Sequence, residues 1–80
     1  MAELLAYLAR ELVDEPEAVR VEEEEREDAL VLVLRVAPDD IGKVIGRNGR
    51  IARALRTLVR ASSARDGRRV LVEIADPDDQ

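Results

Sequence analysis

The sequence predicts a single α+β domain, in which helices cover one face of a three-stranded mixed sheet. Three observations support this prediction. Helix-like and strand-like hydrophobic patterns follow one another in the order α-β-β-α-α-β. The eighty residues suffice for one domain (1–80), near the lower size limit for a core without disulfides or metals. A two-glycine turn separates the two central helices, at Gly46-Arg47-Asn48-Gly49.

The first helix is predicted over residues 2–13, because its apolar residues recur at helical spacing. The apolar stripe consists of Leu5, Leu8, Ala9 and Leu12, with Leu4 beside it. Residues 14–17 include Pro16 and are expected to end this helix. Residues 18–22 alternate valine with charged side chains, which is typical of a strand with one solvent-exposed face.

The sheet is expected to form around the second strand. Residues 22–28 are almost all acidic, and we expect a hairpin loop with frayed strand ends there. Residues 30–36 are a nearly continuous run of valine and leucine, which favours a central strand. A helical crossover would then bring a third strand, predicted over residues 70–74, parallel to it. The core thus spans 2–75, and residues 76–80 are expected to be a loose tail.

A short helix is predicted between Pro38 and the glycine turn. Asp39 and Asp40 stand at its N-terminus, where carboxylates usually satisfy amide donors and complement the helix dipole. This capping role is favoured over an acid/base or metal pair.

The long helix is predicted from about Gly49 to Arg65. Its buried stripe is predicted to consist of Ile51, Leu55, Leu58, Val59 and Ser62. Another face of the same helix repeats arginine, at Arg53, Arg56 and Arg60. Arginines in register without interleaved glutamates favour an anion-binding face over a merely solvated one.

The charge of the chain is distributed unevenly. The net charge is −5, but residues 41–69 hold Lys43 and eight arginines against one aspartate. Residues 1–40 hold four arginines against thirteen acidic residues. Because phosphate affinity depends on the local field, the basic block can bind nucleic acid although the whole chain is acidic.

Composition argues against an enzyme or a cofactor protein. Without cysteine or histidine, the usual zinc, haem and iron–sulfur sites and the commonest general base are unavailable. No Gly-Lys-Ser/Thr motif follows the glycine turn, and Ser62 and Ser63 have no histidine partner. The chain shows neither a membrane-spanning apolar run nor a signal peptide, so we expect a cytoplasmic protein without metal or cofactor.

The glycine turn offers two interpretations. Gly46 could simply be a helix C-cap, with Gly49 relaxing the turn. The flanking sequence favours a phosphate-binding role, because glycines let a backbone approach a ligand closely and the helix that follows points its first amides outward. Basic residues surround the turn and supply the predicted phosphate contacts, at Lys43, Arg47, Arg50 and Arg53. The only aromatic residue, Tyr7, lies outside the motif, so stacking cannot be the main binding term.

With its topology and size, the run from Ile41 to Arg56 resembles a type II KH domain over residues 2–75, and is similar to small bacterial single-KH-domain RNA-binding proteins of the KhpA family. This resemblance implies that single-stranded RNA is held by a G-x-x-G clamp at Gly46, Arg47, Asn48 and Gly49. It also implies an aliphatic groove for the bases, lined by Ile41, Val44, Ile45, Ile51, Ala52 and Leu55. The family resemblance further implies an RNA chaperone that acts with a larger KH-containing partner, KhpB, in RNA-level control of cell-wall growth and cell length.

One alternative is an interaction module whose KH turn is vestigial. The leucines of the first helix are hard to cover in so small a domain, and they are expected, with neighbouring strand residues, to contact a second copy or the larger partner. The tip of the turn discriminates between these readings. Arg47-Asn48 keeps the charge and donors that RNA requires, whereas an acidic tip would indicate a protein-binding fold.

Overall fold

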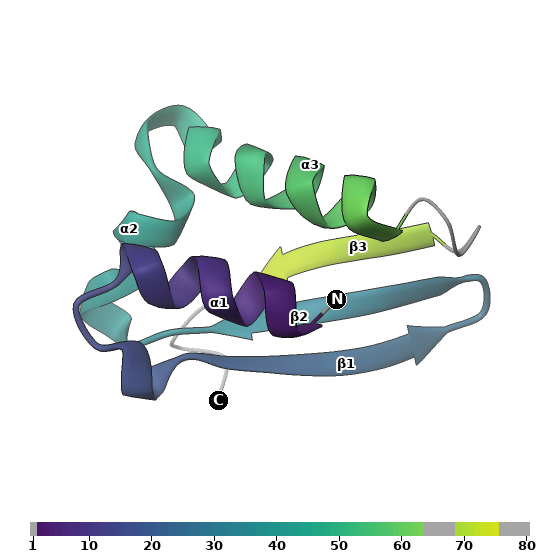
Figure 1. Ribbon diagram of the computed structural model, residues 1–80, viewed down its shortest axis with the longest axis horizontal. Coiled ribbons are helices and arrows are strands. Elements are labelled where there is room, and N and C mark those ends of the chain that lie inside the picture. Colours follow the sequence, from purple (N-terminus) through teal and green to yellow (C-terminus); the bar gives the residue numbers. More distant parts are fainter. Residues whose placement is uncertain (1, 64–68, 76–80) are drawn as a thin grey trace.

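The computed structural model describes residues 2–63 and 69–75, and its elements follow the predicted order (Figure 1). The helices and strands are α1 (Ala2–Leu12), β1 (Arg20–Arg26), β2 (Ala29–Arg35), α2 (Ile41–Ile45), α3 (Arg50–Ser63) and β3 (Arg69–Ile74). Short 3₁₀ turns precede β1, α2 and α3, at Pro16–Ala18, Pro38–Asp40 and Arg47–Gly49. The predicted end of the long helix at Arg65 and the tail over 76–80 lie outside the described residues. Within the described residues, no helix is long and apolar enough to cross a membrane.

The sheet has the predicted mixed topology. Its strand order is β1-β2-β3, with β1 antiparallel and β3 parallel to the central β2. The helices lie on one face of this sheet, and the β1–β2 hairpin projects beyond them (Figure 1). The predicted α+β architecture is therefore confirmed.

The core lies between the sheet and the helix layer. Leu32 and Leu34 of β2 are completely buried, together with Leu5 and Ala9 of α1 and Val59 of α3. These residues alternate along the strand and recur at helical spacing in the helices, so each element turns one apolar face inward.

The buried stripe of α3 differs from the predicted one. Ala52, Leu55, Val59 and Ser63 are buried, whereas Leu58 is 50% exposed and Ser62 is exposed. The spacing of apolar residues indicates the helical period well, but it indicates only approximately which side of the helix faces the core. In addition, α1 covers only part of the apolar surface of α3. This shift leaves Leu58 available at the surface.

The acidic segment is strand rather than loop, so the predicted hairpin boundary is wrong. Paired residues run from Arg20 opposite Arg35 to Arg26 opposite Ala29, and only Glu27 and Asp28 form the turn. Strand pairing uses main-chain groups, and the edge position of β1 leaves its glutamates in water. Ala18, predicted to begin the strand, lies in a 3₁₀ turn instead.

Candidate nucleic-acid interface

The turn between α2 and α3 has a backbone conformation that few residues can adopt. Gly46 has φ 75° and ψ 173°, a region that is essentially restricted to glycine. Asn48 has φ 58° and ψ 24°, the left-handed region that asparagine tolerates, and Gly49 has φ 74°. Two main-chain bonds close the turn: the Gly46 N–H donates to the Gly42 carbonyl at 2.9 Å, and the Gly49 N–H to the Gly46 carbonyl at 3.2 Å.

The two glycines of the turn are required for different reasons. A Cβ atom at Gly46 would lie 2.6 Å from Cγ1 of Ile51, so α3 packs directly on the Gly46 backbone. A Cβ at Gly49 would meet nothing within 4 Å, and its positive φ alone favours glycine. Gly46 therefore joins the turn to α3, while Gly49 leaves open space beside the backbone.

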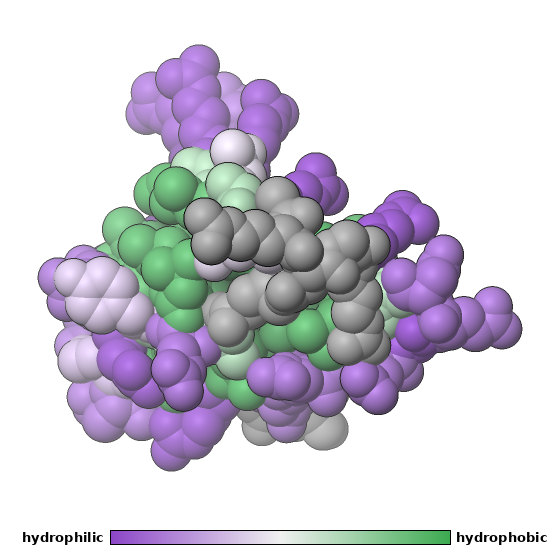
Figure 2. Space-filling view, turned by 45° about the vertical axis from the view of Figure 1, so that its right-hand side comes forward, coloured by the Kyte–Doolittle hydropathy of each residue, from purple (hydrophilic) through white to green (hydrophobic). Residues whose placement is uncertain are grey.

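Four exposed polar side chains surround this turn. Arg47 and Asn48 form its tip, and Arg50 and Arg53 follow on the first turn of α3. The N–H of Arg50, the first residue of α3, already donates to the Arg47 carbonyl, so the N-terminus of α3 contributes mainly the positive end of its helix dipole to this region. The turn is the highest part of the chain in Figure 1, and Figure 2, turned about the vertical axis, shows hydrophilic side chains at the top of the molecule. The arrangement can bind an anion such as a phosphate.

Lys43 has other partners. Its Nζ lies 3.0 Å from a carboxylate oxygen of Asp14 and 3.2 Å from one of Asp40. The hydrogen bonds to these two carboxylates raise the pKa of Lys43 above its ordinary value. A phosphate contact from Lys43 stays a prediction, but its ammonium would have to leave two ion pairs to make one.

Asp40 does not cap the helix that follows it, so the predicted capping role is wrong. Neither α2 nor the 3₁₀ turn before it has a side-chain capping hydrogen bond. The Asp40 carboxylate is instead 1% exposed, and it accepts the Glu15 N–H at 3.1 Å and the Lys43 ammonium at 3.2 Å. Burial acts to raise the pKa of Asp40, but hydrogen bonds from the Glu15 and Asp14 backbone and from Lys43 outweigh it and lower the pKa below its ordinary value.

The six predicted groove residues divide into two sets. Val44, Ala52 and Leu55 are buried at 0%, 5% and 3% exposure, so they support the surface from beneath. Ile45 is 37% exposed, and Ile41 and Ile51 are half-buried. Only the three isoleucines present apolar atoms that a ligand could touch.

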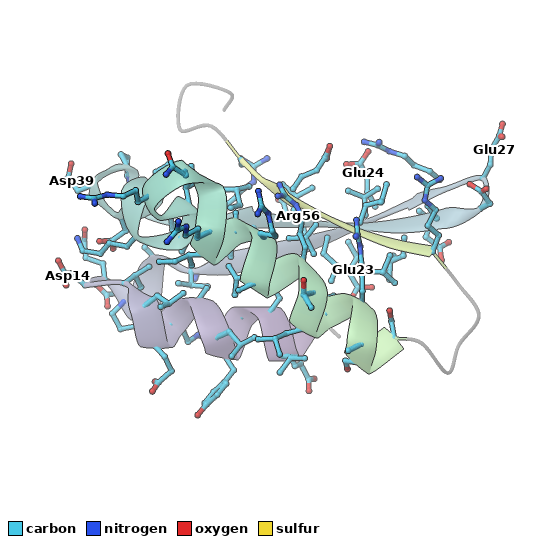
Figure 3. The ribbon with its side chains drawn as sticks, turned by 90° about the horizontal axis from the view of Figure 1, so that it is seen from above. Asp14, Glu23, Glu24, Glu27, Asp39 and Arg56 are labelled. Carbon is cyan, nitrogen blue, oxygen red and sulfur yellow. The ribbon has the colours of Figure 1, made fainter. Side chains whose placement is uncertain are left out.

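The predicted arginine face also divides. Arg53 and Arg60 are exposed, but Arg56 is half-buried and its Nε donates to the Val72 carbonyl at 3.3 Å. Figure 3 shows Arg56 reaching from α3 towards β3. Arg56 therefore links the helix to an edge strand, and its charge is only partly available to a ligand.

An apolar hollow between α1 and α3 was not predicted as a site. It measures about 370 Å³ and is lined by Leu8, Glu11, Leu12, Arg50, Ile51, Ala54, Leu55 and Leu58. Figure 2 shows hydrophobic side chains gathered over the helix layer, below the hydrophilic side chains at the top of the molecule. The many leucines of the first helix indicated that part of this surface would be apolar. The contribution of Leu58 was missed, because Leu58 was predicted to be buried.

The order of elements, the mixed sheet and the two-glycine turn define a type II KH fold. A solved structure supports this class: a point variant of Era from Aquifex aeolicus, bound to GDP·AlF4⁻, superposes with a TM-score of 0.67 at 22% identity. The match covers 91% of this chain and 28% of the Era chain, so this chain corresponds to about a quarter of Era.

Sequence comparisons identify the family. The family model for the KhpA/KhpB KH domain matches residues 2–74. The RNA-binding protein KhpA of Caldanaerobacter subterraneus subsp. tengcongensis is 50% identical over 74 residues, which cover 92% of this chain and 99% of that protein. The RNA-binding protein KhpA of Treponema pallidum is 54% identical over 74 residues, which cover 92% of each. The chain belongs to the KhpA/KhpB KH-domain family.

Proposed function

We propose that this protein binds single-stranded RNA through the turn between α2 and α3. The observation that supports the proposal most is the positive φ of Gly46, Asn48 and Gly49. This conformation leaves the main chain of the turn accessible to a ligand. The exposed Arg47 lies beside it, just before the fourteen-residue helix α3. KH domains clamp about four backbone nucleotides on such a G-x-x-G loop. The relatives are named RNA-binding protein KhpA, which supports the same ligand.

The turn would hold the sugar-phosphate backbone, and the partly exposed isoleucines would contact the bases. Arg47, Arg50 and Arg53 supply positive charge along the path of the backbone. Ile45 and Ile51 offer aliphatic surface beside them, and the buried Val44, Ala52 and Leu55 keep that surface rigid. Without aromatic stacking and with few polar groups facing the bases, binding should be weak and only loosely specific.

This activity suits a post-transcriptional regulator. A small module that binds single strands loosely can act as an RNA chaperone in the cytoplasm, and a larger KH-containing protein of the KhpB kind would extend its binding surface. RNA-level control of cell shape is the process in which we place it. The retained Arg47-Asn48 tip argues against the alternative of an interaction module with a vestigial turn.

Salt dependence of binding tests whether arginines contact phosphates. Three contacts from Arg47, Arg50 and Arg53 predict that log K falls with log salt at a slope of about −2, since each contact on a single strand contributes about −0.7. Arg53→Gln should reduce the slope by about 0.7 for every RNA sequence alike. Fluorescence anisotropy with a labelled single-stranded RNA measures both slopes.

Arg10→Gln is the matched control, because it removes one exposed positive charge on α1, outside the proposed interface. Its slope should equal that of the wild type. A salt-independent affinity in the wild type would contradict the phosphate contacts and leave the fold assignment unaffected.

The hollow between α1 and α3 favours a second property, pairing with another KH chain. Leu58 is 50% exposed and Leu12 is 37% exposed, and both line the hollow together with the small side chain of Ala54. The same surface thus carries a protruding side chain and a hollow that could receive one, as a symmetric dimer interface requires. We infer that a second copy, or a larger KH-containing partner, covers the part of this surface formed by Leu12, Ala54 and Leu58, and leaves Arg50 and Ile51 at its edge for RNA. The interface therefore involves α1 and α3, whereas the sequence suggested α1 and strand residues.

Light scattering over a range of concentrations tests the pairing. The wild type should approach twice the monomer mass at high micromolar concentration, and Leu58→Asp should remain a monomer because it places a charge in an apolar interface. Thr57→Asp adds the same charge at a neighbouring exposed position and should still pair. A wild type that stays monomeric, and that recovers no partner from cell extract, would contradict the interface but not the RNA proposal.

A further inference from the structure

An ion-pair network around the buried Asp40 connects the start of α2 to the segment between α1 and β1. Both carboxylate oxygens of Asp40 are used: one accepts the Glu15 N–H and the other accepts the Lys43 ammonium. Lys43 in turn reaches Asp14, 3.0 Å away, just beyond the end of α1. Figure 3 shows Asp14 at the end of the molecule where α1 and α2 lie. Two short contacts thus tie residues 14 and 15 to residues 40 and 43, and Asp40 and Lys43 are also paired with each other.

The position of this network matters because α2 is very short. The helix has five residues, and Val44 is its only buried side chain. Five residues are too few to form a stable helix by themselves, so tertiary contacts must fix the orientation of α2. The glycine turn begins at the residue after α2, which means that any rotation of α2 moves the turn.

Two supports therefore hold the turn, one on each side. On the α3 side, Ile51 packs against the Gly46 backbone. On the α2 side, the Asp40–Lys43–Asp14 network sets the helix from which Gly46 emerges, and the Gly46 N–H is bonded to Gly42 within that helix. Neither Asp14 nor Asp40 is expected to contact a phosphate, because a carboxylate and a phosphate repel each other.

We propose that Asp40, Lys43 and Asp14 are positioning residues, which orient α2 and thereby fix the geometry of the RNA-binding turn without contacting RNA. The proposal rests on the proposed function. It assigns Lys43 to this network instead of to the phosphate backbone, and it gives two acidic residues a favourable effect on the binding of a polyanion.

The direction of the change in RNA affinity distinguishes a positioning role from a purely electrostatic effect. Asp14→Asn and Asp40→Asn each remove a negative charge near the interface, so electrostatics alone would tighten RNA binding. If these residues position the turn, both variants should bind more weakly, by about 3-fold to 10-fold, with the salt slope unchanged. Affinity is measured by anisotropy at a temperature where circular dichroism shows each variant to be folded. Hydrogen exchange of the amides at residues 46–50 should also be faster in both variants.

Lys43→Gln separates the two roles of the lysine. A positioning role predicts weaker binding with an unchanged salt slope, whereas a phosphate contact predicts a slope smaller by about 0.7. Glu22→Gln is the matched control, since it breaks a 2.8 Å ion pair with Arg35 on the opposite face of the sheet and should leave affinity unchanged.

The outcomes are distinct from a failure of the RNA proposal itself. Tighter or equal binding by folded Asp14→Asn would overturn the positioning role, and this variant remains informative if Asp40→Asn fails to fold, because the Asp14 side chain is 78% exposed. If the wild type does not bind single-stranded RNA at all, the proposed function fails and the network keeps only a structural role.

Discussion

Arg47→Asp combined with Asn48→Asp should lower the affinity for single-stranded RNA about 100-fold while the protein remains folded. The double change removes one cation from the tip of the turn and places two carboxylates where the phosphate is expected. Each carboxylate at contact distance from a phosphate costs about 1 kcal/mol even in water, and the lost cation adds a similar amount. Together these terms reach about 3 kcal/mol, and 1.4 kcal/mol corresponds to a factor of ten in affinity.

The fold should survive this change for reasons that the structure provides. Both side chains are exposed, and substitutions at exposed positions usually alter stability by less than about 0.5 kcal/mol. Asn48 has a left-handed backbone, which aspartate also tolerates. Gly46 and Gly49 are unchanged, so the main chain of the turn keeps its geometry.

The control for this experiment should carry the same change in net charge at a distant site. Tyr7→Glu with Arg10→Glu also makes the chain three units more negative, on exposed positions of α1. Mobility shifts measure the RNA affinity of both double variants, and thermal melts measure their stability. Wild-type RNA affinity in a folded turn variant, or an equal loss in the α1 variant, would contradict the assignment of the turn as the binding site.

The parts of the fold that sequence predicted well are those in which one local pattern dominates. The run of valine and leucine in residues 30–36 favoured a buried strand, and β2 is indeed the central strand of the sheet. The glycines at 46 and 49 marked the turn because no other residue adopts such a backbone easily, and both have positive φ. In each case the structural preference is a property of the residues themselves and does not depend on a distant contact.

The errors arose where a distant partner decides the structure. Glu22 to Glu25 have a poor intrinsic preference for strands, but pairing with β2 overrides it. Asp40 looked like a helix cap because its distant partner, the backbone N–H of Glu15, could not be foreseen from its neighbours in sequence. The same is true of Leu58, whose exposure depends on where α1 packs on α3.

The candidate site shows both situations. The tip residues Arg47 and Asn48 and the following Arg50 and Arg53 are all exposed around one turn, an arrangement that follows from their closeness in sequence. The groove depended on tertiary packing, and Val44, Ala52 and Leu55 proved to be buried. Hydrophobicity alone does not distinguish a side chain that lines a binding surface from one that supports it.

Gly46→Ala should destabilise the protein by about 2 to 6 kcal/mol, because the new methyl group combines backbone strain with a steric clash. The backbone region of Gly46 costs other residues about 1–3 kcal/mol. The new methyl would also stand 2.6 Å from Cγ1 and 3.0 Å from Cβ of Ile51, which cannot move without shifting α3. Overpacking of this kind adds about 1–3 kcal/mol. For a domain of this size, the melting temperature should fall by about 10 °C or more.

Gly42→Ala provides the matched control, four residues earlier in α2. A Cβ at Gly42 would meet nothing within 4 Å, and alanine is favoured over glycine inside a helix by about 1 kcal/mol. The control should therefore be as stable as the wild type or slightly more stable in urea denaturation. If Gly46→Ala unfolds at the same urea concentration as Gly42→Ala, the contact between Ile51 and the turn is not rigid. The turn could then not owe its shape to α3, and its geometry would have to be maintained from the α2 side alone.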